Sequence, residues 1–201
     1  LYEMYLTEAI EERKTDLLNR NNEYKKLRKK LDDIFNKYPN LQYILEENEI
    51  ELVIANGENV SHGRGMLPAH YEELMDEGID FFTLGNHAFG KKEIVSILEN
   101  EENIVRPANI TSKAAGVGTR EIDVRITNLL GRAFITELSP LSPYAAMEEI
   151  CKENTAPIHI VDFHAEATGE KMALAYAYNG KISALLGTHT HVQSADERIL
   201  S

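Results

Sequence analysis

The sequence of 201 residues has a single cysteine, Cys151. One thiol excludes an intramolecular disulfide framework and any metal cluster built from several cysteines. The sequence also lacks the uninterrupted run of about 18 to 20 apolar residues that a membrane-spanning helix requires, and the apolar core of a signal peptide. We therefore expect a cytoplasmic protein with no membrane partner.

Positive charge is also scarce. The 21 Lys and Arg residues stand against 33 Asp and Glu residues, which gives a formal net charge of −12. Sequence-independent binding of nucleic acid needs a basic surface that neutralises phosphates, so this balance disfavours nucleic acid as a partner. A small anionic substrate remains compatible with the composition if a metal supplies positive charge.

Glycine is absent before Gly57, and all seven histidines also lie beyond that point. This distribution divides the chain into a helical segment, 1–49, and a second domain, 50–201. Apolar residues recur at steps of three and four from Tyr24 to Tyr38, which predicts one apolar helix face. That face either packs on the body of its own chain or binds a partner, which includes a second copy in a homo-oligomer. We favour packing on the body, because the repeat is short for a coiled coil.

Short apolar runs alternate with amphipathic segments over residues 50–201, a pattern typical of the α/β class. The predicted strands are Glu51–Ala55, Ile79–Leu84, Glu121–Thr127, Arg132–Thr136, Ile158–Val161 and Ile182–Leu186. The predicted helices are Pro68–Glu77, Lys91–Asn100, Tyr144–Glu153 and Glu170–Tyr178.

Polar side chains follow four of these strands directly. In open α/β sheets, ligands bind beyond the carboxyl ends of the strands, so we expect these four segments to build one site. They are Asn56–Asn59, Gly85–His87, Asp162–His164 and Gly187–His191.

The residue types in these segments narrow the chemistry. Histidine, glutamate and asparagine form a nitrogen and oxygen ligand set, which suits Mn, Fe, Zn, Co or Ni. His189 and His191 can both face one cavity from an extended strand end. The Glu58 carboxylate could bridge two metals, and His87 could protonate a leaving oxygen. Each signal is weak alone, because a lone histidine on an apolar strand is more often a core residue.

Five segments, in this order, resemble the YmdB-like family of the calcineurin-like metallophosphoesterase superfamily. The resemblance covers residues 50–201 and implies a sandwich of sheets flanked by helices. It also implies a centre of two divalent or trivalent metal ions (Fe, Mn or Zn) and hydrolysis of phosphodiesters, with cyclic nucleotides as the associated substrates. The five segments are Val53–Asn59, Leu84–His87, Val105–Asn109, Asp162–Thr168 and Gly187–Gln193.

The same resemblance implies a role for individual side chains. Glu58 corresponds to the bridging ligand, and His87 corresponds to the catalytic general acid. The ligands of the second metal would be Asn86, His164 and His189, and His191 and Asn59 would lie at the first.

The sequence departs from the family at both ends. The family begins with a strand that ends in Gly-Asp, whose Asp binds the first metal, and this sequence has no such strand. Leu1–Leu6 resembles that strand only weakly, and Glu8 would then take the place of the metal-binding Asp. The hairpin before Gly131 is shorter than the family's, and the family continues into further strands beyond Ser201. We therefore expect an incomplete sandwich and a first metal position with few ligands.

Two alternatives to an active phosphodiesterase remain open. One is a catalytically weakened metal-binding or scaffold protein whose helical N-terminal segment recruits a partner. The other is a mononuclear zinc hydrolase of the amidohydrolase type, which also carries a His-x-His pair. That alternative is disfavoured, because the pair lies on the first strand there and on the last predicted strand here.

Five further residues admit a functional and a structural interpretation. Arg64 and Arg106 could each contact a phosphate or stabilise a turn. Asp162 and Glu166 could orient ligating imidazoles or lie in solvent. Cys151 has no patterned partner and is expected to be an ordinary helix residue.

Overall fold

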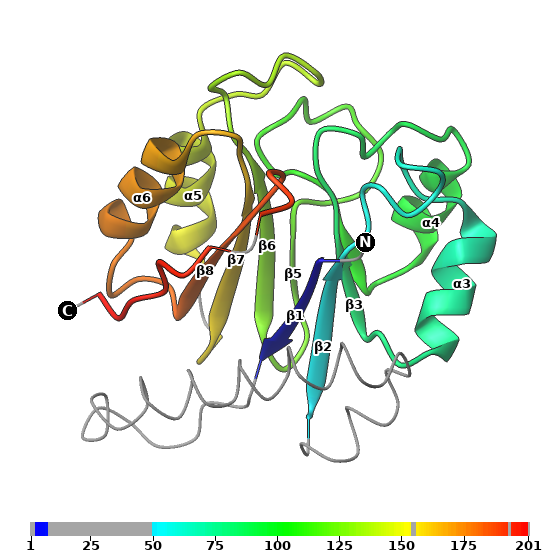
Figure 1. The fold of residues 1–201 in the computed structure, drawn as a ribbon, viewed down its shortest axis with the longest axis horizontal. Helices are drawn as coiled ribbons and strands as arrows, with labels where there is room; N and C mark the ends of the chain where they lie inside the picture. Colours follow the sequence, from blue (N-terminus) through cyan, green and yellow to red (C-terminus); the bar gives the residue numbers. More distant parts are fainter. Residues whose placement is uncertain (1–2, 8–49, 154–155, 193, 201) are drawn as a thin grey trace.

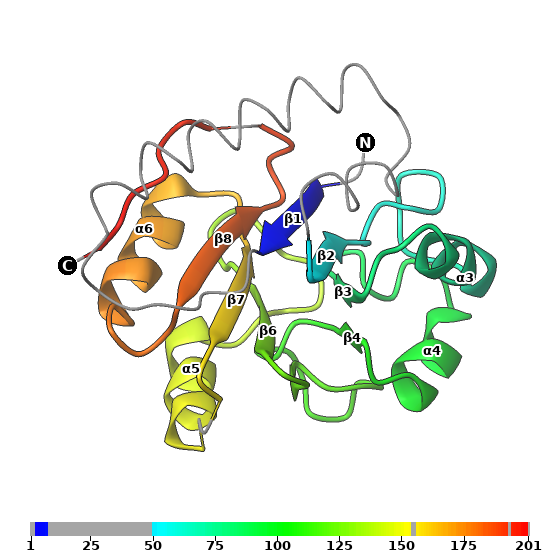
Figure 2. The same cartoon turned by 90° about the horizontal axis from the view of Figure 1, so that it is seen from below.

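The computed structural model describes residues 3–7, 50–153, 156–192 and 194–200 of the chain. Two sheets of four strands each pack against one another. Helices α3 and α4 cover the outer face of the first sheet, and α5 and α6 cover that of the second (Figures 1 and 2). The mixed α/β sandwich flanked by helices, which the metallophosphoesterase resemblance implied, is confirmed.

The first sheet has the strand order β1-β2-β3-β4. Its strands β2, β3 and β4 are parallel, and helices α3 and α4 form the crossovers between them. Pro68 occupies the first turn of α3, where its missing N–H needs no partner. The elements are β1 (Glu3–Thr7), β2 (Leu52–Asn56), α3 (Pro68–Asp76), β3 (Phe81–Thr83), α4 (Ile94–Asn100) and β4 (Ile104–Val105).

The second sheet has the order β5-β6-β7-β8, with β6, β7 and β8 parallel. The side chain of Ser142 accepts a hydrogen bond from the Ala145 N–H and so caps the start of α5. The elements are β5 (Thr119–Glu121), β6 (Arg125–Leu130), α5 (Pro143–Lys152), β7 (His159–His164), α6 (Thr168–Ala177) and β8 (Ala184–Thr188).

Apolar side chains fill three layers between these elements. Ile54 and Phe81 of the first sheet pack with Ile126 and Ile160 of the second. One further buried cluster joins the first sheet to α3 and α4, and another joins the second sheet to α5 and α6. These cores bring the carboxyl ends of β2, β3, β7 and β8 to one end of the sandwich.

The four predicted helices are confirmed within a few residues, whereas one predicted strand is divided between two strands by a turn and another is wrong. The range 121–127 is a hairpin, in which the Ile122 N–H donates to Val124 O at 3.2 Å and the chain turns between β5 and β6. The range 132–136 is a loop, because the N–H groups of Arg132 and Ala133 donate to the Glu170 carboxylate and not to a strand.

The N-terminal segment is described only at residues 3–7. These residues form strand β1, so the expectation of helix throughout 1–49 is wrong for them. The strand overlaps Leu1–Leu6, the segment that weakly resembled the family's first strand. β1 runs antiparallel to β2, with Glu3 opposite Asn56 and Thr7 opposite Leu52. The last residue of β1, Thr7, therefore lies at the opposite end of the sheet from Asn56.

The remainder of 1–49 lies outside the described residues, including Glu8 and the expected helix from Tyr24 to Tyr38. The domain boundary at residues 49 and 50 stays a prediction. No helix within the described ranges has the length and apolar character needed to cross a membrane.

Candidate metal centre

Four side chains predicted as ligands meet where strands of both sheets end. Glu58 follows β2, Asn86 follows β3, His164 is the last residue of β7 and His189 follows β8. The Nε2 atom of His164 lies 3.0 Å from Asn86 Oδ1, 3.1 Å from His189 Nδ1 and 3.2 Å from Glu58 Oε2. Glu58, Asn86 and His164 are buried. The parallel arrangement of β2 with β3 and of β7 with β8 thus delivers these groups to one point.

A chain of hydrogen bonds fixes which nitrogen of His164 carries the proton. Thr188 Oγ1 donates to Asp162 Oδ1 at 2.7 Å, so it accepts the bond at 2.8 Å from His164 Nδ1. A neutral imidazole has one N–H, and Nδ1 uses it. The Nε2 atom therefore directs a lone pair toward Glu58 and Asn86.

His189 is also oriented by a carboxylate, which contacts its ring directly. Its Nε2 atom lies 3.0 Å from Glu166 Oε2, a pairing that places the proton on Nε2 and leaves the Nδ1 lone pair facing His164. Burial lowers the pKa of His189, and repulsion from His164 in its protonated form lowers it further, so the neutral form of His189 is favoured. The backbone of His189 has a φ of 92°, a strained conformation for a residue other than glycine.

The position before Asn86 has to be glycine. A Cβ atom on Gly85 would lie 2.2 Å from Glu58 Oε2 and 2.4 Å from His164 Nε2, closer than real contacts allow. The absence of a side chain at Gly85 therefore lets the carboxylate and the imidazole approach from either side.

The other oxygen of Glu58 faces a second, more open group. Asn59 Nδ2 donates to Glu58 Oε1 at 3.1 Å and lies 3.1 Å from His191 Nε2. Asn59 is half-buried and His191 is exposed. The two oxygens of Glu58 thus face two different sets of side chains, as a bridging carboxylate would.

His87 lies beside these groups. Its backbone N–H donates to Glu58 Oε2 at 3.0 Å, and its half-buried ring lies 3.4 Å from Asn86 Nδ2. Burial opposes ionisation of Glu58, but the hydrogen bond and charge of His164 in its protonated form and the N–H of His87 outweigh it, so the pKa of Glu58 is lowered when no metal is bound. Glu58 is therefore a carboxylate at neutral pH.

The donor set fits a metal ion. Atoms of Glu58, His164 and His189 that could each bind a metal lie within 4.8 Å of one another. Lone pairs of two imidazoles, a carboxylate and an amide repel one another unless a cation or a proton lies among them. Nitrogen and oxygen donors of this kind suit Mn, Fe or Zn. The role of each of the six predicted ligands remains a prediction.

The other residues singled out in the sequence divide clearly. Arg106 is buried and donates to the backbone carbonyls of Pro107 and of residues 114–116, so it stabilises a turn. Arg64 is exposed on the loop after Glu58. Asp162 and Glu166 accept hydrogen bonds that orient His164, through Thr188, and His189.

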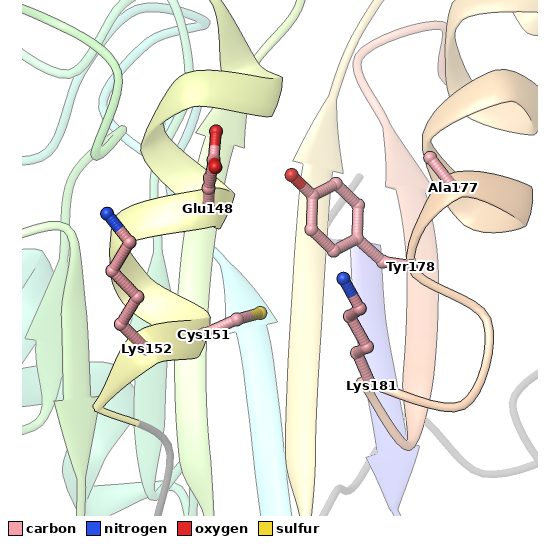
Figure 3. A pocket seen from close by; sticks show the side chains of 6 residues that line it. All are labelled: Glu148, Cys151, Lys152, Ala177, Tyr178 and Lys181. Carbon is pink, nitrogen blue, oxygen red and sulfur yellow. The ribbon is translucent and has the colours of Figure 1, made fainter.

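A separate pocket of about 590 Å³ lies between α5 and α6 (Figure 3). It contains Cys151, whose pKa is raised by burial, so the thiol is not activated as a nucleophile. The pocket lies at the carboxyl ends of these helices, which is the end of the sandwich away from the metal centre. Its lining residues are Glu148, Cys151, Lys152, Ala177, Tyr178 and Lys181.

Three contributors to the site were missed in the sequence. Thr188 and Gly85 were seen only as neighbours of the histidine and asparagine ligands. Buried Asn56 joins the two sheets, since it donates to Asp162 Oδ2 at 3.0 Å and accepts from the Glu58 N–H at 3.3 Å. A polar residue at the carboxyl end of an otherwise apolar strand was the available signal for Asn56 and for Thr188.

Comparisons with known proteins agree with this geometry. The chain is 42% identical over 154 residues to a Bacillus subtilis protein named 2′,3′-cyclic-nucleotide 2′-phosphodiesterase, covering 73% of the chain and 58% of that protein. A crystal structure described as a novel phosphatase from Mycoplasma pneumoniae matches with a TM-score of 0.74 and 37% identity, over 81% of the chain and 61% of that structure. A hypothetical protein from Thermus thermophilus matches with a TM-score of 0.69 and 40% identity, over 74% of the chain and 60% of that structure.

The chain spans 58–60% of the length of the curated relatives it matches. A family model described as YmdB-like protein matches residues 36–201. The chain therefore belongs to the YmdB-like protein family.

Proposed function

We propose that this chain carries the site of a metal-dependent phosphodiesterase that hydrolyses small phosphodiesters, cyclic nucleotides among them, with two metal ions. One observation carries the proposal: the Nε2 lone pair of His164 is directed at the oxygens of Glu58 and Asn86 and at His189, at the strand ends. The name of the Bacillus subtilis relative supports the substrate class.

The residues divide into two sets around Glu58. Asn86, His164, His189 and Glu58 Oε2 would hold one ion, and Glu58 Oε1, Asn59 and His191 would hold the other. Bound ions would supply positive charge to the phosphate oxygens and raise the acidity of a water molecule. The net charge of the chain, −12, disfavours binding of an anionic substrate, and bound cations would offset this repulsion.

The chain's own residues have separate tasks. Asp162 and Thr188 hold His164 in one tautomer, and Glu166 does the same for His189. His87 would donate a proton to the departing oxygen as general acid. Its backbone bond to Glu58 Oε2 keeps it beside the carboxylate. Hydrolysis would form a P–O bond to the water oxygen, break one P–O ester bond and place a proton on the departing oxygen, which leaves a phosphomonoester and a free hydroxyl group, both on one molecule when the substrate is cyclic.

A second candidate function is a metal-binding protein with weak or no catalysis. The observation in its favour is the contrast across Glu58, because the set at Oε1 consists of half-buried Asn59 and exposed His191. A site of this kind would bind one ion firmly and the other weakly, and the N-terminal segment, which the sequence predicts to be largely helical, would recruit a partner.

Metal analysis combined with turnover separates the two. We expect two metal ions per chain and hydrolysis of 2′,3′-cyclic AMP, whose departing alkoxide needs a proton, after loading with Mn²⁺. In His87→Gln, kcat should fall about 10²- to 10⁴-fold with the metal content unchanged, since a general acid contributes that much. His62→Gln, at an exposed histidine outside the cluster, is the matched control and should change neither quantity.

One ion per chain, with turnover that is absent or indifferent to His87→Gln, would favour the second candidate. Binding of no metal would contradict both candidates.

A further inference from the structure

The loop between β6 and α5 carries an aromatic ring in an unusual position. Phe134 has a φ of 64°, a left-handed conformation that is strained for a bulky residue, and its side chain is 87% exposed. Exposure of the ring and strain of the backbone are both unfavourable for folding. The residues that the structure describes therefore give no reason for a phenylalanine at this position.

The loop holds Phe134 firmly on both sides. Before it, the Glu170 carboxylate accepts hydrogen bonds from the N–H groups of Arg132, at 2.9 Å, and Ala133, at 3.2 Å. After it, Ile135 is buried in a cluster with Ile110 and Leu130. The ring is therefore presented to solvent by an anchored loop.

The same loop borders the metal centre. The Gly131 N–H donates to the backbone oxygen of His164 at 2.8 Å, and Phe134 follows three residues later, within about 10 Å along the chain. Figure 1 shows this connection at the end of the molecule where β6 and β7 finish.

The far end of the loop also lies near the segment that carries His87, because Leu138 and Phe89 pack against the same buried cluster. The pKa of Glu137 is lowered, chiefly by a hydrogen bond from its own backbone N–H and to a smaller extent by the charges of His87 and Arg64.

We infer that Phe134 is a specificity residue that stacks on the nucleobase of a nucleoside phosphodiester whose phosphate lies at the metal centre. The inference rests on the proposed function and adds the part of the substrate beyond the phosphate. Every nucleobase has a flat π face, so a single ring can bind purines and pyrimidines alike.

A nucleobase suits this surface better than another protein does. In the loop 131–142 the exposed large apolar side chains are Phe134 and Leu141, seven residues apart, and the exposed residues next to Phe134 are polar: Arg132, Thr136 and Glu137. A stable protein interface needs an extended surface, far larger than one ring. A planar ligand needs only one face.

The test compares two cyclic phosphodiesters, 2′,3′-cyclic AMP and glycerol 1,2-cyclic phosphate, which has no base. In Phe134→Leu, we expect KM for cyclic AMP to rise at least about fivefold with kcat unchanged. All constants for the base-free substrate should stay the same. Phe134→Tyr should retain the wild-type KM. Tyr176→Ala, at an exposed aromatic residue on α6, is the matched control and should change nothing.

An equal effect of Phe134→Leu on both substrates, or none on either, would overturn the inference. So would a lower melting temperature of Phe134→Leu, because it would show that the ring packs against protein. If the wild-type chain hydrolyses neither substrate, the proposed function fails, and equilibrium binding of adenosine 3′-monophosphate then decides the inference. Phe134→Leu should weaken that binding at least about fivefold and leave binding of glycerol phosphate unchanged; equal binding would refute stacking.

Discussion

Strand β7 has a histidine at each end, and the two differ in what surrounds them. His159 and His164 are both 1% exposed, and each contacts a threonine on a neighbouring strand. His159 Nε2 lies 2.8 Å from Thr127 Oγ1, and its Nδ1 atom has no hydrogen-bond partner among the described residues. His164 has its second ring nitrogen among a carboxylate, an amide oxygen and another imidazole.

This comparison separates a core histidine from a candidate ligand. Burial lowers the pKa of His159 to about 4, with a further contribution from Arg125, so its ring is neutral and part of the core. His164 is equally buried, but its free lone pair points at other lone pairs. The neighbours of the second nitrogen, and not burial or position in a strand, distinguish the two.

The largest expected effect comes from removing the imidazole of His164, compared with removing that of His159. His164→Gln should lose bound metal and lower kcat/KM more than about 100-fold, since changes to groups that only orient a ligand already cost 10- to 100-fold. His159→Gln, the matched variant, should leave metal content and kcat/KM unchanged. Metal analysis and phosphodiester hydrolysis measure both. Equal losses in the two variants would remove the distinction between the two histidines.

Filling the gap between Glu58 and His164 should have the next largest effect. Gly85→Ala adds a Cβ that meets both groups, so it should cost about 1–3 kcal/mol of folding free energy and lower metal affinity. Gly169→Ala is the control: that Cβ meets nothing within 4 Å and lies in α6, where alanine should stabilise by about 0.5–1 kcal/mol. Urea unfolding and metal titration test the pair. Unchanged metal affinity in Gly85→Ala would argue against this placement of the ligands.

Each of the two histidines contacts a threonine, so the two threonines can be compared in the same way. Thr188→Val removes the bond to His164 Nδ1 and should lower metal affinity about 10- to 100-fold. Thr127→Val removes the bond to His159 and should cost about 1–3 kcal/mol of stability without changing metal affinity. A metal titration in which both variants match the wild type would contradict the orienting role of Thr188.

The smallest effect is a pH dependence of stability from His159. Its pKa of about 4 in the folded state lies below the ordinary value of 6.5. The unfolded chain therefore binds a proton first as the pH falls, and stability present above pH 6.5 is lost down to about pH 4. Between pH 7 and pH 4.5 this group should account for about 2 kcal/mol.

Urea unfolding at the two pH values measures this loss, with His159→Gln as the reference. An identical loss of stability in wild type and His159→Gln would show that His159 makes no contribution.

Much of the fold could be predicted, because local patterns reflect it directly. Pro68 predicted the start of α3 and Gly78 its end. The polar residues after four strands predicted which end of the sandwich holds the site. The loop 131–141 could not be read from its apolar residues, since bonds from Arg132 and Ala133 to distant Glu170 decide its path. Nor could the antiparallel pairing of β1, which depends on where β2 lies.

The sequence predicted that the candidate ligands come together, but it did not predict the residues that position them. Glu58, Asn86, His164 and His189 stand in recognisable segments, and they do meet. Sequence spacing alone did not assign Thr188 to the Nδ1 atom of His164, because that contact joins two strands. The lack of a Cβ at Gly85 mattered only once the opposing groups were in place.

The central claim is that the Nε2 atom of His164, and not the buried ring of His159, binds a metal ion. Anomalous diffraction from crystals of the Mn²⁺-loaded or Zn²⁺-loaded chain tests it most directly. We predict a peak about 2.0–2.2 Å from His164 Nε2 and within bonding distance of His189 Nδ1 and Glu58 Oε2. A metal-loaded crystal with no peak among these three atoms would contradict the account.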